Sequence, residues 1–138
     1  MSDLQCPARI VLLDADVAHT STEALQAERV AHVYADRGCG ALDPATALAA
    51  AWEVVVTGLD ASPGGLRTAL EDLADLHRGE TVVVVTHGEV MTALLPTLGW
   101  AVEDRAPCAG LVLERDGDGW RNRGRVTARP DGGAAQTA

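Results

Sequence analysis

Apolar residues occur in short runs along the chain, and the clearest run lies in residues 81–86, where four consecutive valines stand between two threonines. Valine is stiff at χ1 and packs well on a pleated surface, so this run predicts a β-strand. A strand that is apolar on both faces is typical of the middle of a parallel sheet with helices on either side. A second apolar run, over residues 9–14, predicts another buried strand, which ends in an acidic turn containing Asp14 and Asp16.

Two helices are predicted in the first half of the chain. Residues 20–38 have Thr20 and Glu23 at capping-box spacing, apolar positions suited to one helix face, and a closing arginine and glycine. Residues 43–52 open with an aspartate and a proline, an N-cap and first-turn pair, and continue as an alanine-rich run. Residues 54–56 fit either a short strand or the end of that helix, and three valines do not decide between the two.

The second half adds two more helices and a hairpin. Residues 66–76 place leucine and alanine at helical spacing with charged residues outside, which predicts an amphipathic helix packed on a sheet. Another helix begins near Gly88 and is kinked or restarted at Pro96. Residues 109–115 and 120–127 flank a loop of aspartate and glycine, which predicts a β-hairpin. The whole pattern predicts an α/β fold with a mainly parallel central sheet, helices on both faces and a C-terminal β-hairpin.

Composition narrows the class of protein. The 138 residues fit one domain, expected over residues 1–128, followed by a disordered tail over residues 129–138. The net charge of −9, from 20 acidic and 11 basic residues, argues against nucleic acid or an anionic membrane surface as partner. One local cluster of basic residues, interpreted as a solvated strand face, comprises Arg121, Arg123, Arg125 and Arg129.

Cysteine usage and hydropathy indicate the compartment. Three separated cysteines suggest neither a disulfide framework nor a zinc site, so a reducing cytoplasm is the simplest location. No signal peptide opens the sequence, and no apolar run approaches about 18 residues. We therefore expect a cytoplasmic protein without a membrane segment.

His87 is the leading candidate site residue because it directly follows the valine strand. In open α/β sheets, ligands bind outside the carboxyl ends of the strands, and the helix near Gly88 is expected to point its positive end at the same crevice. Asp14 and Asp16 end the other predicted strand. A carboxylate that orients His87 would raise the pKa of its imidazole toward neutrality and make it a general base or acid.

Other polar residues add to this crevice or stay outside it. His19 can reach the crevice as a second imidazole or stand exposed before a helix N-cap, and Glu89 adds a carboxylate. Asp14, Asp16 and His19 have only weak metal-ligand spacing, so we expect no metal and no cofactor. The histidines interpreted as structural, one in the first predicted helix and one near the end of another, are His32 and His77.

Several segments resemble the histidine phosphatase (phosphoglycerate mutase-like) superfamily. Residues 81–95 resemble its second histidine motif, and residues 106–120 look like the closing hairpin that follows it there. Residues 63–65, Pro-Gly-Gly before a helix, match the family's pattern, and residues 21–38 are similar to its first helix. The resemblance implies a phosphoglycerate mutase-like fold. In that family the first strand ends in an Arg-His-Gly motif whose histidine attacks the phosphoryl group, while arginines and the second histidine hold the phosphate oxygens.

The resemblance fails at this chemistry. The matching turn has Ala15, between two aspartates, where the nucleophile would stand. An alternative register matches residues 9–25 to a later strand and helix of the family with the opening motif deleted, and both registers remove the nucleophile. Of the family's site residues, only His87 carries over, with Gly88 behind it. Carboxylates repel a phosphate dianion by several kcal/mol at about the dielectric of a protein, which argues against phosphatase or phosphomutase activity.

Three functions remain open. The first is a repurposed enzyme that performs an isomerisation, dehydration or cyclisation on a small, specialised metabolite by acid–base chemistry. The second is a catalytically inactive relative that binds a ligand or a partner chain, and the third is a residual phosphatase with a nucleophile from elsewhere. A shortened middle that leaves sheet edges uncovered favours a homodimer. The residues assigned to catalysis are His87, Asp14 and Asp16, and those assigned to substrate binding are His19, Gly88 and Glu89.

Overall fold

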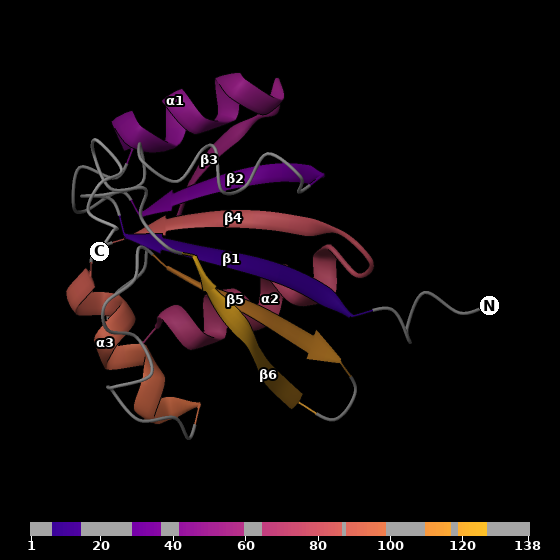
Figure 1. Cartoon of the computed structure of the whole chain (residues 1–138), viewed down its shortest axis with the longest axis vertical. Helices are drawn as coiled ribbons and strands as arrows, with labels where there is room; N and C mark the ends of the chain where they lie inside the picture. Colours follow the sequence, from indigo (N-terminus) through magenta and orange to yellow (C-terminus); the bar gives the residue numbers. More distant parts are fainter. Residues whose placement is uncertain are drawn as a thin grey trace, which may run out of the picture.

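The computed structural model of the chain describes residues 7–14, 29–36, 42–59, 65–86, 88–98, 110–116 and 119–126. Its strands form one six-stranded sheet in the order β3-β2-β4-β1-β5-β6 (Figure 1). The strands are β1 (Ala8–Asp14), β2 (Val30–Asp36), β3 (Val56–Leu59), β4 (Thr81–Thr86), β5 (Gly110–Asp116) and β6 (Gly119–Val126). The helices are α1 (Leu42–Trp52), α2 (Leu66–Leu76) and α3 (Gly88–Thr97).

The sheet is mixed, with a parallel part and an antiparallel part. Strands β3, β2, β4 and β1 pair in parallel. Strands β5 and β6 form a hairpin that pairs antiparallel with β1 through β5. The predicted mainly parallel sheet and C-terminal hairpin are therefore confirmed.

Strand β4 is buried on both faces, as the valine run predicts. Val82 and Val84 belong to a core cluster shared with α2 and α3, whereas Val83 and Val85 belong to a second cluster shared with α1. All four side chains are 0% exposed. Successive side chains of a strand point to opposite sides of the sheet. An uninterrupted run of valines therefore packs against helices on both faces.

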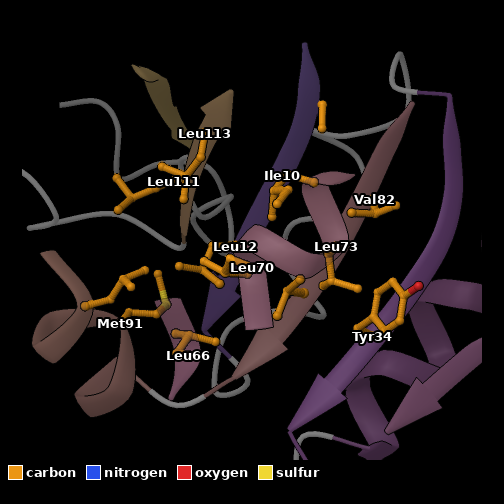
Figure 2. Close-up of a cluster of buried hydrophobic side chains, with 14 of the residues drawn as sticks. Ile10, Leu12, Tyr34, Leu66, Leu70, Leu73, Val82, Met91, Leu111 and Leu113 are labelled. Carbon is orange, nitrogen blue, oxygen red and sulfur yellow. The ribbon is translucent and has the colours of Figure 1, made fainter. Parts of the chain in front are cut away.

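The core cluster beneath α2 and α3 is drawn in Figure 2. Leu70 and Leu73 of α2 and Met91 of α3 pack with Leu12 of the central strand β1. Tyr34 extends this cluster along β2. The helical spacing of the leucines in α2 thus serves to cover the sheet, which is the predicted amphipathic packing.

Strand β5 approaches β1 closely at Gly110. A Cβ atom at this position would lie 2.1 Å from the carbonyl oxygen of Leu12, a backbone atom that cannot move aside cheaply. Glycine is therefore required where the hairpin joins the parallel part of the sheet.

The predicted helix over residues 20–38 is wrong for Val30–Asp36, which forms β2 beside β4. Val33 packs in the α1 cluster while the next residue, Tyr34, packs in the α2 cluster, as strand alternation requires. His32, assigned to that helix, lies on β2. The likeness of this segment to the first helix of the histidine phosphatase superfamily fails for the same residues.

The other predicted elements agree with the structure, with small changes at their ends. The residues after Val55 form β3, so the ambiguous valines lead into a strand. Helix α3 runs through Pro96 to Thr97 without a break in its assignment. The expected tail, residues 129–138, lies outside the described residues. No helix in the described part of the chain is long and apolar enough to cross a bilayer.

Candidate functional site

Three polar residues end the three neighbouring parallel strands β1, β4 and β2. The register of β1 and β4 places Asp14 beside Thr86. On the other side of β4, the Thr86 hydroxyl donates a hydrogen bond to Oδ2 of Asp36 at 3.2 Å. Asp14, Thr86 and Asp36 therefore form a row across the carboxyl edge of the sheet, with a carboxylate on each side of the threonine.

The row faces the side of the sheet that carries α2 and α3. Each of its members follows, by two positions, a residue of the core cluster beneath these helices, namely Leu12, Val84 or Tyr34. Because side chains alternate along a strand, residues two positions apart share a face. The polar row thus continues the apolar face of the sheet at the edge where α3 begins.

The members of the row differ in burial. Thr86 is 0% exposed and Asp36 only 6%, whereas Asp14 is partly exposed. Neighbouring strands lie about 4.8 Å apart, so the α-carbons of the two aspartates are separated by about 10 Å across β4. One carboxylate is therefore shielded from solvent and the other is open to it.

Helix α3 adds two of the predicted residues at this edge. It begins at Gly88, and the exposed Glu89 lies in its first turn. The N-terminus of a helix carries a partial positive charge, which Glu89 partly offsets. Carboxylates therefore border the edge from β1, β2 and α3.

The arginines with described contacts are engaged by other groups. Arg67, in the first turn of α2, pairs with Glu71 at 3.1 Å and donates to the carbonyl oxygen of Thr97. Arg9 lies toward the amino end of β1 and pairs with Glu114 at 3.5 Å. None of the four parallel strands ends in a basic residue. The described edge thus lacks the arginine at a strand end that a phosphate site would use.

Only part of the predicted site lies within the described residues. The structure places Asp14, Gly88 and Glu89 at the same edge of the sheet. The predicted residues that lie outside the described chain are Asp16, His19 and His87. Among the residues that are described, no group of three or more histidine, cysteine, aspartate or glutamate side chains is placed to hold a metal ion.

Sequence reasoning missed Asp36 and Thr86. The predicted helix over residues 20–38 contains Asp36, and this wrong prediction conceals its place at the end of a strand. A signal for it does exist in the sequence. Residues 9–14 and 30–36 are both apolar runs that end in aspartate, and parallel strands that end alike bring those carboxylates to one edge of the sheet.

A second polar cluster joins β2 to the end of α2 and includes Tyr34, which lies two positions before Asp36 on β2. The Tyr34 hydroxyl and His77 Nε2 are 2.7 Å apart, and His77 Nδ1 lies 2.7 Å from Oε1 of Glu80. His32 stacks on Tyr34 with ring centroids 4.4 Å apart, and its Nε2 lies 2.7 Å from the Thr57 hydroxyl. Burial raises the pKa of Tyr34, with a smaller contribution from Glu80. These contacts tie the end of α2 to β2, and β2 to β3, in keeping with the structural role expected for both histidines.

Comparison with known proteins gives the fold a family context. Residues 65–125 match the family model of the histidine phosphatase superfamily (branch 1). No curated protein sequence matches the chain significantly. The match contains the valine strand and the hairpin on which the sequence resemblance rests, so that resemblance is confirmed. It leaves out the turn after β1, where the family's nucleophile motif would stand.

Two solved structures share the fold. YhfR of Bacillus stearothermophilus superposes with a TM-score of 0.71 and 14% identity, over 88% of this chain and 98% of that chain. Phosphoglycerate mutase from Plasmodium falciparum gives a TM-score of 0.67 and 16% identity, over 91% of this chain and 95% of that chain. These neighbours confirm the expected phosphoglycerate mutase-like α/β fold.

Proposed function

We propose that this chain, which has the fold of the histidine phosphatase superfamily, is an enzyme that performs acid–base chemistry on a small, specialised metabolite instead of phosphoryl transfer. In this proposal His87 is the general base or acid. Asp14 and Asp16 act with it, and the residues proposed to contact the substrate are His19, Gly88 and Glu89.

The observation that carries the proposal is the pair of carboxylates that flank β4. Asp14 and Asp36 end the strands on either side of the strand that leads to His87. A phosphate dianion about 8 Å from one carboxylate is repelled by about 4 kcal/mol at an effective dielectric of 20. The same charges favour an imidazolium, the form that a histidine takes after it accepts a proton.

The chemistry requires only proton movements. A ring nitrogen of His87 takes a proton from a carbon next to a carbonyl group, and the carboxylates stabilise the imidazolium that forms. Return of that proton to a different atom completes an isomerisation. Its transfer to a departing hydroxyl group, which leaves as water, completes a dehydration. Neither outcome needs a phosphohistidine.

Proton exchange in D2O tests this function without knowledge of the natural substrate. The probes are small ketones and β-hydroxy ketones, and deuterium incorporation next to the carbonyl is followed by NMR. General-base catalysis contributes roughly 100-fold to 10,000-fold, so His87→Gln is expected to lower exchange by at least about 100-fold. Asp14→Asn is expected to lower it by about tenfold, from loss of roughly 1.4 kcal/mol of charge stabilisation.

A matched control and a phosphatase assay separate the alternatives. Asp75→Asn removes a carboxylate on α2, where Asp75 pairs with Arg78 at 3.1 Å, and should leave exchange unchanged. If the folded protein catalyses deuterium exchange in none of the probes, the result would favour an inactive binding subunit. Hydrolysis of p-nitrophenyl phosphate that His87→Ala abolishes would establish a residual phosphatase, as would thermal stabilisation by vanadate, and either result would reject acid–base chemistry as the function.

A further inference from the structure

A chain of hydrogen bonds links the turn between α2 and β4 to strand β2. Glu80 Oε1 lies 2.7 Å from His77 Nδ1, and His77 Nε2 lies 2.7 Å from the Tyr34 hydroxyl. The turn is closed by the Glu80 amide, which donates to the carbonyl oxygen of His77 at 2.9 Å, with Gly79 at a φ of 78°. Local backbone geometry therefore brings the carboxylate back onto the imidazole, and the imidazole reaches across to β2.

The chemistry of these groups fixes the direction of each hydrogen bond. A carboxylate only accepts, so Nδ1 of His77 donates to Glu80. The other nitrogen of a neutral imidazole is an acceptor, so the Tyr34 hydroxyl donates to Nε2. A proton added at Nε2 reverses this bond, and the hydroxyl hydrogen then requires a different acceptor. Because Tyr34 is 7% exposed, water supplies such an acceptor poorly, and the contact is weakened.

His32 places a second imidazole in the same cluster. Its ring stacks on Tyr34 with centroids 4.4 Å apart, and its centroid lies 5.9 Å from that of the His77 ring. Its Nε2 is 2.7 Å from the Thr57 hydroxyl on β3. A proton on His32 therefore puts a positive charge next to His77, where contacts join β2 to the end of α2 and to β3.

We propose that His32 and His77 form a pH-sensitive switch, in which protonation of these imidazoles loosens the contact between β2 and the end of α2. The switch adjoins the amino end of β4, whereas the carboxylate row lies at the carboxyl end of that strand. It is therefore independent of the acid–base chemistry proposed above. Since β3 pairs with β2, we expect the loosening of β2 to extend to β3.

The groups around His32 set the direction of the response. Among the described residues, titratable groups face it from the end of α2, from the turn before β4 and from β2 itself, namely His77, Glu80 and Tyr34. Arg78, in the same turn, pairs with Asp75 at 3.1 Å. Burial, followed by His77, lowers the pKa of His32, while Glu80 raises it in part. The contact is therefore complete above about pH 6.5, the ordinary pKa, and is lost as the pH falls through the lower folded-state pKa.

The test is an NMR titration of the full chain between about pH 7.5 and pH 5. Tyr34 is the only tyrosine, so its ring signals need no further assignment, and the imidazole signals are assigned by their loss in His32→Gln and His77→Gln. We expect the Tyr34 ring signals to shift with the same midpoint as the imidazole of His32. Protection factors of the β2 amides against hydrogen exchange should fall by about twofold or more over this range, while those of β5 should stay constant.

Two variants should move the pKa of His32 in opposite directions. His77→Gln removes the neighbouring imidazole, so the pKa of His32 should rise, whereas Glu80→Gln removes a carboxylate, so it should fall further. Glu80 is about half exposed, so Glu80→Gln keeps the proposal testable if His77→Gln does not fold. The matched control is Glu71→Gln on α2, where Glu71 pairs with Arg67 at 3.1 Å, and it should leave the pKa of His32 unchanged.

Two results would overturn the switch. A pKa of His32 that is the same in the wild type, His77→Gln and Glu80→Gln would show that His32 titrates independently of the cluster. Tyr34 ring signals that stay constant while His32 titrates would show that the proton does not reach the contact between β2 and α2. Either result would leave the proposed function standing, because neither concerns His87.

Discussion

His32 is the residue whose ionisation is linked most clearly to folding. Burial, and after it the neighbouring His77, lowers the pKa of His32 below its ordinary value, and Glu80 offsets part of this shift. The folded protein therefore favours the neutral imidazole more than the unfolded chain does. The stabilisation from His32 is complete above about pH 6.5, the ordinary pKa, and is lost as the pH falls through the lower folded-state pKa.

This linkage predicts a difference in pH dependence between two variants. Between about pH 7.5 and pH 5, the unfolding free energy measured in urea should fall less steeply in His32→Gln than in the wild type, because the titrating group is gone. Thr57→Val removes the hydroxyl partner of His32 and keeps the imidazole, so its slope should stay close to that of the wild type. Equal slopes in His32→Gln and the wild type would show that His32 titrates alike in the folded and unfolded chains.

At the scale of the element, β4 illustrates how composition specifies position in a sheet. A strand with one solvent-exposed face alternates apolar and polar residues. The residues of β4 do not alternate in this way. Its valines enter one core cluster on each side of the sheet. The run therefore indicates a central strand from local sequence alone.

Substitution on either face of β4 should consequently be costly. Val83→Thr and Val84→Thr preserve shape and bury a hydroxyl group on the α1 side and the α2 side, respectively. We expect each to lower the unfolding free energy in urea by about 1–3 kcal/mol. Val55→Thr is the control, measured at a protein concentration at which the chain is monomeric. Val55 is 64% exposed in the single chain, so the substitution should cost less than about 0.5 kcal/mol. Tolerance of either substitution in β4 would mean that one face of the strand is solvated.

At the scale of the whole molecule, the β3 edge of the described sheet is the feature that concerns assembly. Strand β3 has four residues and pairs with β2 on one side. Val55, directly before β3 in the chain, is 64% exposed. An edge strand of one chain can pair with the same strand of a second copy in a two-fold arrangement. We therefore propose a homodimer through this edge.

Light scattering after size-exclusion chromatography measures the predicted assembly. The wild type should have about twice the chain mass of 14.4 kDa. The variant Val55→Arg should have the monomer mass and keep the circular dichroism spectrum of the folded chain, because this side chain is exposed in the single chain. Ala93→Arg on the exposed part of α3 is the matched control and should remain dimeric. A monomeric wild type at about 100 μM, well above the dissociation constant of a stable interface, would reject the dimer.

The sequence alone predicts the class of the fold, the central place of β4, helices α1 to α3 and the closing hairpin. These features follow from contiguous residues, because periodicity, capping residues and turn residues report burial and backbone conformation locally. It also indicated that Asp14, Gly88 and Glu89 gather at one edge, since they adjoin predicted strand ends. The resemblance of residues 81–95 to the histidine phosphatase superfamily pointed to the same fold.

The strand over residues 30–36 and the place of Asp36 beside Thr86 depend on tertiary pairing and do not follow from local sequence. The apolar positions of this segment suit a helix face as well as a strand buried on alternate sides, so local pattern does not separate the two. Pairing with β3 and β4 supplies backbone hydrogen bonds from residues about 20 to 50 positions further along the chain. A strand depends on such distant partners, and so does the carboxylate row that those strands bring together.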